Sequence, residues 1–236
     1  MPVMAAMPIV PRPGIGAMMR DTEQQIVTQP LGGRFVGEVV LTPRAVADLL
    51  TWLHGQIGDV QLIAGSSLYR DRVGERIASP LLTLTSRFDA PGVAAVSADA
   101  FLTPPVEVLR DGVLKTLTPS LYGSRKTGLP HVPTAAGGWD VAAGATPRAQ
   151  LVAGVARGAI VGRLSMGAPA PNGDFSGVIK NSFAVVDGQV GAALTETMIS
   201  GNIAQMLHDV VAVSRERLDT GPLLLPWLRI GGLHFS

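Results

Sequence analysis

Residues 173–190 read GDFSGVIKNSFAVVDGQV, and this sequence indicates antiparallel β-structure. Its second half predicts a hairpin, because the β-rich runs 182–186 and 189–194 flank Asp187-Gly188. Asp-Gly between two such runs is a strong hairpin signal, since a type I′ turn needs positive φ at both central residues. The same dipeptide recurs at Asp111-Gly112, between the runs 106–110 and 113–117. The sequence therefore predicts two pairs of antiparallel strands.

Further strands are predicted on both sides of these hairpins. Runs of β-forming residues predict strands over 34–41, 81–88, 159–164 and 223–230. Pro226 interrupts the last run, which favours an edge or bulge position because proline cannot donate to a strand ladder. Residues 130–144 and 167–177 are rich in turn-forming residues and are predicted to be loops.

Helices are fewer than strands. Thr42-Pro43 begins an apolar pattern of helical spacing, which predicts a capped helix over 43–56. Shorter helices are predicted over 120–127 and 146–157, and another after Asn202, whose apolar face extends to Val211. Because there is no regular βαβ alternation, the sequence predicts an α+β domain with a mainly antiparallel sheet and a few amphipathic helices.

Composition narrows the function classes. The formal net charge of the 236 residues is +1, so no global field points to nucleic acid. No stretch has the ~20 uninterrupted apolar residues of a membrane helix. The chain has no cysteine, which excludes disulfides, zinc–thiolate sites and cysteine nucleophiles. We expect a cytoplasmic protein, since it needs no disulfides.

Residues 1–36 are predicted to be an N-terminal arm or linker ahead of a domain over 37–236. Residues 1–19 are apolar and rich in methionine, but four prolines interrupt them and no basic region precedes them. That pattern does not indicate a secretory signal. An alternative is an exposed apolar arm that packs on a partner chain.

The histidines do not predict a metal site on this chain. His54, His131, His208 and His234 are scattered, and none has the His-x-x-x-His spacing that places two ligands on one helical face. We expect His54 and His208 to be solvated surface residues.

Serine nucleophiles are not indicated by spacing either. Ser66, Ser67 and Ser176 lie near glycines, but none matches Gly-x-Ser-x-Gly, and tight turns explain these stretches as well. An independent enzyme built on Ser176, Lys180 or Asp174 stays open as one hypothesis.

The segment 173–202 concentrates polar side chains among short apolar runs. These side chains either cap and hydrogen-bond a compact hairpin-to-helix unit, or contact a ligand or peptide. The residues that we predict to bind a substrate are Asp174, Phe175, Ser176, Lys180, Asn181 and Asn202.

The same segment, followed by LTETMISGN over 194–202, resembles the C-terminal signature of the TldD/TldE (PmbA) family. Four further segments match in the expected order: LTPRAVADLLTWL over 41–53, GSSLYRDRVGERI over 65–77, VEVLRDGVLKTLTPSLYGSRKTGLP over 106–130, and LLLPWLRIGG over 223–232. The resemblance covers about residues 37–232. Several unrelated patterns in one order are far more specific than any single motif.

The resemblance implies an α+β, barrel-like C-terminal domain. It also implies two-subunit metalloproteases that trim unfolded or precursor peptides, with zinc on the TldD-type subunit and no metal on the TldE type. An extended peptide substrate would add as a strand to an exposed sheet edge.

The chain departs from the metal-bearing subunits in two respects. Their His-Glu-x-x-x-His motif is not among these residues, and their metal-ligating cysteine cannot exist here. Since zinc hydrolysis needs three protein ligands and a water, the resemblance implies a non-catalytic TldE-like subunit without a cofactor, paired with a TldD-like partner. The alternative is a stand-alone binding or assembly protein, and a homo-oligomer stays open.

Overall fold

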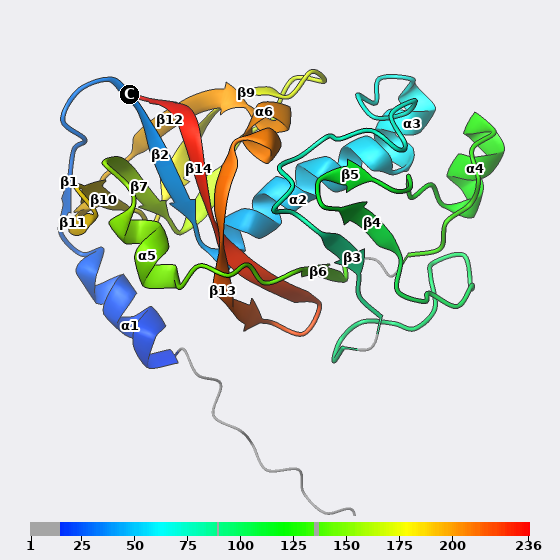
Figure 1. The fold of residues 1–236 in the computed structure, drawn as a ribbon, viewed down its shortest axis with the longest axis horizontal. Coiled ribbons are helices and arrows are strands. Elements are labelled where there is room, and N and C mark those ends of the chain that lie inside the picture. The colour runs from blue at the N-terminus through cyan, green and yellow to red at the C-terminus, as the bar shows by residue number, and fades with distance from the viewer. Residues whose placement is uncertain (1–14, 89, 135–136) are drawn as a thin grey trace, which may run out of the picture.

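The computed structural model describes residues 15–88, 90–134 and 137–236. Within these residues, fourteen strands join into one sheet, accompanied by six helices (Figure 1). The strands are β1 (Thr28–Gln29), β2 (Phe35–Leu41), β3 (Leu84–Ser86), β4 (Glu107–Arg110), β5 (Val113–Leu114), β6 (Trp139–Val141), β7 (Arg157–Val161), β8 (Arg163–Ser165), β9 (Asp174–Lys180), β10 (Phe183–Val186), β11 (Gln189–Leu194), β12 (Thr197–Asn202), β13 (Val210–Asp219) and β14 (Leu223–Phe235). The helices are α1 (Ile15–Gln24), α2 (Pro43–Ile57), α3 (Asp59–Ala64), α4 (Leu121–Thr127), α5 (Arg148–Ala153) and α6 (Ile203–His208).

Most neighbouring strands pair antiparallel, which confirms the predicted α+β class. The parallel pairs are β1–β11, β2–β7 and β6–β14. Both predicted hairpins form, as β4–β5 and β10–β11. Their turns have the expected positive φ: 49° and 75° at Asp111-Gly112, and 48° and 73° at Asp187-Gly188.

The strands around the core close into a ring. β7 and β8 run on in one register against β10 and β9, and both strands bend where Gly162 lies next to Asn181. A Cβ atom on Gly162 would lie 2.4 Å from the Asn181 carbonyl oxygen, so this close approach requires glycine. β2 joins β7 to β14, and β12 joins β14 to β9. The ring is therefore complete, in agreement with the barrel-like domain that was expected.

Along one side of β8, helix α2 lies where a strand partner would otherwise pair. β2 and β7 pair as far as Leu41 and Val161, where the chain turns into α2. Thr42 Oγ1 then donates to the Gly162 carbonyl at 2.9 Å, and Asp48 Oδ2 accepts from the Leu164 amide at 2.9 Å. Two side chains thus satisfy backbone groups that a continued β2 would otherwise have paired.

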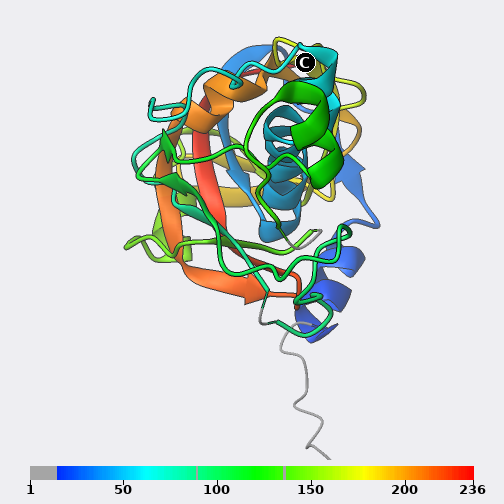
Figure 2. The same cartoon turned by 90° about the vertical axis from the view of Figure 1, so that its right-hand side faces the viewer.

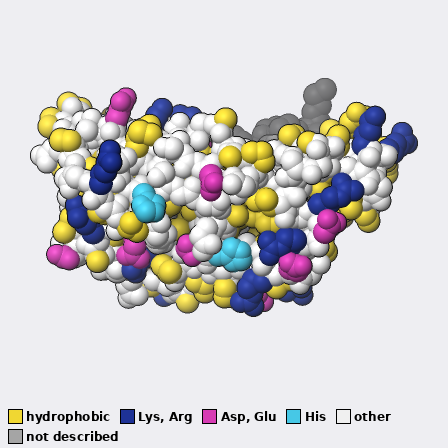
Figure 3. Space-filling model, turned by 90° about the horizontal axis from the view of Figure 1, so that it is seen from above, with side chains coloured by type: hydrophobic (Ala, Val, Ile, Leu, Met, Phe, Trp, Pro, Cys, Tyr) yellow, Lys and Arg dark blue, Asp and Glu magenta, His cyan; other side chains and the backbone are white. Residues whose placement is uncertain are grey.

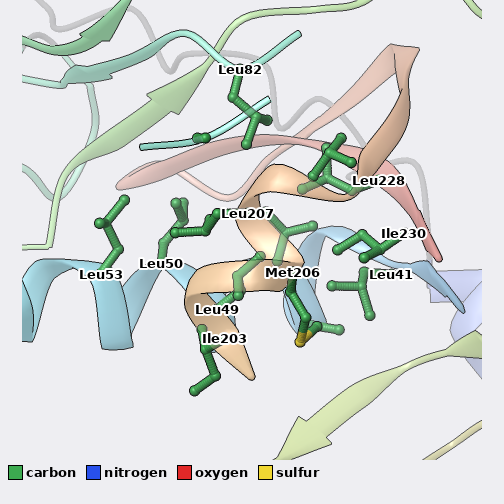
Figure 4. Close-up of a cluster of buried hydrophobic side chains, with 14 of the residues drawn as sticks. Leu41, Leu49, Leu50, Leu53, Leu82, Ile203, Met206, Leu207, Leu228 and Ile230 are labelled. Atoms are coloured by element: carbon green, nitrogen blue, oxygen red, sulfur yellow. The ribbon is translucent and has the colours of Figure 1, made fainter. Parts of the chain in front are cut away.

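The main core lies where α2 and α6 pack against the ring. Figure 4 shows Leu49, Leu50 and Leu53 of α2 facing Ile203, Met206 and Leu207 of α6. Leu228 and Ile230 of β14 complete this contact. A second, smaller core lies on the other face of the sheet under α5 and consists of Val40, Leu151, Val155 and Val185. The end of β2, from Val39 to Leu41, is therefore buried on both faces.

The strands β3 to β6 extend the sheet towards α3 and α4 on the right of Figure 1, and Figure 2 looks at that end. The Asp59 carboxylate of α3 fixes the start of α4, because its Oδ1 accepts from the Ser120 amide at 2.8 Å. Ser120 caps α4 through the Gly123 amide at 3.1 Å. The predicted helix over 120–127 is confirmed, including its end at Gly128 with φ 75°.

Several predicted elements were wrong in extent. The predicted loops 130–144 and 167–177 contain β6 and the start of β9, because pairing with distant strands overrides their turn-rich composition. The predicted strand 81–88 is reduced to β3, and 159–164 divides at Gly162. The predicted helix 146–157 is reduced to α5, which has Pro147 at its cap position and no side-chain cap. The helix after Asn202 ends at His208, because Val210 begins β13.

Pro226 lies at a bulge, one of the two positions predicted for it. The β13–β14 register shifts between Val213 and Arg217, and Arg217 faces Pro226.

At the N-terminus, α1 was not predicted, and residues 1–14 of the predicted arm lie outside the described residues. No helix in the described ranges has the length and apolar character to cross a membrane.

Candidate functional site

The predicted binding residues are carried mainly by β9. This strand pairs with β12 in register from Asp174 opposite Asn202 to Ile179 opposite Thr197. Along β9 the side chains alternate: Asp174, Ser176 and Lys180 are exposed and Val178 on the same face is half-buried, whereas the inner face of the strand is buried (Phe175, Gly177 and Ile179). The outer face of β9 is therefore polar except at Val178, and its inner face belongs to the core.

Asp174 and Asn202 form a hydrogen-bonded cluster at one end of this face. Asn202 Nδ2 donates to Asp174 Oδ1, and Asn172 Nδ2 donates to Asp174 Oδ2, both at 2.8 Å. The bond from Asn202, followed by that from Asn172, lowers the pKa of Asp174. Asn202 Oδ1 also caps α6 by accepting from the Gln205 amide at 3.0 Å. This pair thus has the structural role that the sequence left open beside ligand contact.

A row of polar side chains crosses the same face. Ser200 of β12 lies opposite Ser176 on one side and opposite His234 of β14 on the other, and His234 lies opposite Val36 of β2. Directly opposite residues share a face, with Cβ atoms about 5 Å apart. Ser176, Ser200 and His234 make no side-chain hydrogen bond or ion pair within the described ranges. Their hydrogen-bonding capacity remains for water or a ligand. Ser200 and His234 were not among the predicted site residues.

The other predicted residues are placed differently. Phe175 is 7% exposed and belongs to the main core, so its side chain packs there and does not face a peptide. Lys180 lies opposite Arg163, at the far end of β9 from Asp174, which is about 20 Å away at strand spacing. Asn181 is exposed at the bend between β9 and β10, with φ 49°.

Buried groups hold the loop that leads into β9. Gln56 is buried, and its Nε2 donates to the Pro171 carbonyl at 3.3 Å while its Oε1 accepts from the Leu68 amide at 2.9 Å. A Cβ atom on Gly173 would lie 3.2 Å from the ring of Trp52, which meets Tyr69 edge-on at 6.2 Å between centroids. Burial raises the pKa of Tyr69 to about 12. The packing fixes the backbone that presents Asp174.

A pocket of about 150 Å³ elsewhere in the chain shares no residue with this face. It is lined by Arg70, Val73, Thr116, Leu117, Leu129 and Pro130. The Arg70 guanidinium already donates to the Leu62 and Thr127 carbonyls at 3.2 and 3.0 Å. The Arg70 charge in this pocket therefore already has backbone partners, and its contacts stabilise the fold.

Figure 3, seen from the side on which α6 lies, shows basic and acidic side chains interspersed on the surface.

These features define an α+β domain whose closed, mainly antiparallel ring presents a polar outer face. The family model described as the PmbA/TldA metallopeptidase C-terminal domain matches residues 34–236. The chain therefore belongs to this family, and the resemblance seen in the sequence is confirmed.

Relatives of known sequence or structure agree with this assignment. Metalloprotease PmbA of Escherichia coli O157:H7 is 28% identical over 210 residues, which are 78% of this chain and 44% of that protein. The solved structure of a proposed modulator of DNA gyrase from Bacteroides thetaiotaomicron has a TM-score of 0.84 at 22% identity, covering 94% of this chain and 51% of that one. TldE from Thermococcus kodakarensis has a TM-score of 0.78 at 18% identity, covering 94% and 54%. The structures show the shared fold, and the chain spans about half the length of these relatives.

The family name implies a metal, but the side chains described here do not fit a metallopeptidase centre. No group of three or more His, Cys, Asp or Glu in residues 15–88, 90–134 and 137–236 could hold a metal ion. His131 Nε2 is buried without a hydrogen-bond partner, 3.7 Å from Asp99 Oδ2. His54 and His208 are exposed, as predicted. The His54 ring nevertheless lies edge-on to Trp139. Partial burial of the ring lowers the pKa of His54, although the Asp59 carboxylate opposes that shift. No chemical step is assigned to a metal on this chain.

Proposed function

We propose that this chain is a TldE-like, non-catalytic subunit of a metalloprotease complex that processes unfolded or precursor peptides. It shapes the peptide-binding chamber, and a TldD-like partner carries the zinc ion and the hydrolytic chemistry. The complex is a heteromer that acts in the cytoplasm on precursors that mature by trimming.

The family match over residues 34–236 carries this proposal. The likeness to a solved TldE supports the choice of subunit type. The donor set supports it too, because a zinc peptidase needs three protein ligands and a water, whereas this sequence has no cysteine and four dispersed histidines. Since the chain spans about half the length of its relatives, the activity of the whole assembly is part of the proposal.

The outer face of β9 is the surface that we assign to the peptide. Asp174, Ser176 and Asn202 lie together at one end, and Lys180 and Asn181 lie at the other. A peptide lying along this strand would cover about six residues, at about 3.4 Å for each residue. Phe175 supports the face from the core.

Peptide cleavage by defined mixtures tests the proposal. Unfolded peptide is incubated with this chain, with a purified TldD-like zinc subunit, and with both. Cleavage is expected only from the mixture, and a chelator is expected to abolish it because the zinc ion performs the chemistry. Cleavage at full rate by the isolated chain would contradict the proposal.

A matched pair of variants tests the peptide surface. Lys180→Ala is expected to raise the KM of the mixture for peptide by removing a contact on β9. Lys115→Ala removes an equally charged, exposed side chain next to β5 and is expected to leave KM unchanged. Equal effects of the two variants would argue against β9 as the binding surface.

A stand-alone binding or assembly protein is the second candidate. The exposed apolar side chains of Met19, Ile26 and Val27 favour it. A stable homo-oligomer without affinity for a metal-bearing homologue would favour this candidate over the first.

A further inference from the structure

Two cations lie directly opposite each other at one end of β9. Arg163 of β8 pairs in register with Lys180 of β9, and both residues are exposed on the outer face. We call Arg163 and Lys180 the basic pair. Opposite residues of neighbouring strands have Cβ atoms about 5 Å apart, and like charges in these positions destabilise a sheet. The stability of the fold therefore does not explain the basic pair.

A carboxylate beside β8 is already engaged in the fold. Asp48 Oδ2 accepts from the Leu164 amide at 2.9 Å. Burial raises the pKa of Asp48, whereas the Leu164 bond, Arg163 and Arg44 oppose that rise. Two arginines therefore act on this one half-buried carboxylate, but neither forms an ion pair or a side-chain hydrogen bond within the described residues.

Glu196 is a carboxylate near the basic pair on the side of β12. It directly precedes β12, and one further residue of the β9–β12 register would place it opposite Lys180. Glu196 and Lys180 form no ion pair within the ranges that the structure describes. The three cations Arg44, Arg163 and Lys180 exceed the carboxylates of Asp48 and Glu196 by one charge. The cluster therefore keeps capacity for an acidic group of another molecule.

The outer face of β9 has opposite charges at its two ends. The negative end is Asp174, whose pKa is lowered by the bond from Asn202 and then by that from Asn172. The positive end is the basic pair, six residues further along β9, which is about 20 Å at strand spacing. An extended peptide of about seven residues spans this distance. The side chains between the two ends are neutral: Ser165, Ser176, Val178, Met198 and Ser200.

We propose that the basic pair binds a carboxylate of the peptide, and that the β9 face accepts extended peptides with an acidic group at this end. This inference rests on the proposed function, to which it adds the class of substrate. The planar Arg163 guanidinium can hold both oxygens of a carboxylate, and the Lys180 ammonium adds a second charge. Asp174 repels an acidic group at the other end, so the peptide binds in one orientation. The carboxylate belongs to an aspartate or glutamate side chain, or to the C-terminus of the peptide.

Binding of short peptides to the isolated chain tests this inference. Seven-residue peptides with a neutral interior and a blocked N-terminus end in blocked glutamate, in blocked glutamine, or in glutamine with a free carboxylate. Fluorescence anisotropy is expected to give at least about threefold tighter binding for one of the two acidic peptides than for blocked glutamine, because two exposed ion pairs form. Which acidic peptide binds tighter separates a side-chain carboxylate from a C-terminal one. The difference should shrink as salt is raised.

A peptide with glutamate at both ends tests the orientation. It should bind more weakly than the peptide with glutamate only at its C-terminal end, because Asp174 repels the second carboxylate. Equal or tighter binding would contradict the single orientation.

Charge reversal tests the assignment to the basic pair. The double variant Arg163→Glu, Lys180→Glu should bind the glutamate peptide more weakly than the blocked glutamine peptide, which reverses the preference. The double variant Arg163→Gln, Lys180→Gln should abolish the preference without adding a carboxylate near Asp48. The matched control Lys115→Glu, Arg125→Glu reverses two exposed cations elsewhere and should keep the preference. Circular dichroism checks that all three variants fold.

Three results would overturn the inference. The first is that neither acidic peptide binds more tightly than blocked glutamine, which includes no binding of any peptide. The second is a preference that the variants of the basic pair retain, and the third is a control variant that loses the preference as they do. Failure of the proposed function is distinguishable. A mixture that cleaves no peptide, while the isolated chain prefers acidic peptides, leaves a carboxylate-binding site without the protease, whereas normal cleavage without that preference removes the site alone.

Discussion

The Asp48 carboxylate is expected to hold β8 in place at a cost in desolvation. Its Oδ2 accepts from the Leu164 amide at 2.9 Å, at the point where α2 replaces a strand partner. Burial raises the pKa of Asp48 above its usual value of 3.8, although the Leu164 bond, Arg163 and Arg44 oppose that rise. The side chain is half-buried, so part of this cost is screened by water.

Two substitutions of Asp48 separate the effect of its hydrogen-bond acceptor from the effect of its charge. Asp48→Ala leaves the Leu164 amide without an acceptor and should lower the free energy of unfolding by about 1–2 kcal/mol. Asp48→Asn keeps a carbonyl acceptor without the buried charge, and should be within about 0.5 kcal/mol of the parent or more stable. Urea unfolding at neutral pH measures both, and Asp71→Asn, at an exposed carboxylate, is the control.

The direction of the Asp48 pKa shift determines how its contribution to stability changes with pH. The folded-state pKa of Asp48 lies above the unfolded value, so the folded state binds the proton more tightly. The stability due to this proton is fully present below about pH 3.8 and is lost as the pH rises through the folded-state value. The gain from Asp48→Asn should therefore grow from acid to neutral pH. If Asp48→Asn destabilises the chain as much as Asp48→Ala, this reasoning is refuted.

Three further predictions concern single side chains. Ala100 has φ 64°, a left-handed conformation that strains any side chain, so Ala100→Gly should raise the free energy of unfolding by up to about 1 kcal/mol, measured by thermal unfolding. Phe175→Ala should lower it by about 3–5 kcal/mol because the ring is buried, whereas Ser176→Ala should change it by less than about 0.5 kcal/mol; urea unfolding that gives similar losses would contradict the placement of β9. Asn202→Ala should lower the free energy of unfolding by about 1 kcal/mol, because α6 loses its cap. It should also raise the pKa of Asp174 in an NMR titration. An unchanged pKa would show that Asn202 is not the main cause of the lowered pKa of Asp174.

Local chemistry predicted the parts of the fold that depend on a few adjacent residues. The two Asp-Gly turns and the cap at Thr42 are correct because their conformation is set within about four residues. The length of α6 was wrong because Val210 and Val211 suit a helix face and a strand equally well. Its end is decided by β14, whose Ile230 pairs with Val210.

Long-range pairing decided what the sequence could not show. β6 forms within a turn-rich stretch because Trp139 and Asp140 pair with Leu223 and Leu224, more than eighty residues away. The closed ring likewise depends on the joint registers of several strands, and no local pattern encodes it.

The candidate site was predicted in part. The family resemblance pointed to the segment that holds Asp174, Ser176 and Asn202, and the structure brings these three together. The alternation of Asp174, Phe175 and Ser176 was a signal that the middle residue faces the core, and the prediction did not use it. His234 joins the site only through the register of β14 with β12, so its sequence position alone could not place it there.

The zinc content of the isolated chain tests whether its own side chains can hold a catalytic metal ion. The purified chain is loaded with zinc, passed through a desalting column, and analysed by atomic emission. We expect well under one zinc ion for each chain, because no group of three or more His, Cys, Asp or Glu side chains in the described residues 15–88, 90–134 and 137–236 could hold one. One tightly held zinc ion for each chain, lost when a histidine is substituted, would contradict this expectation.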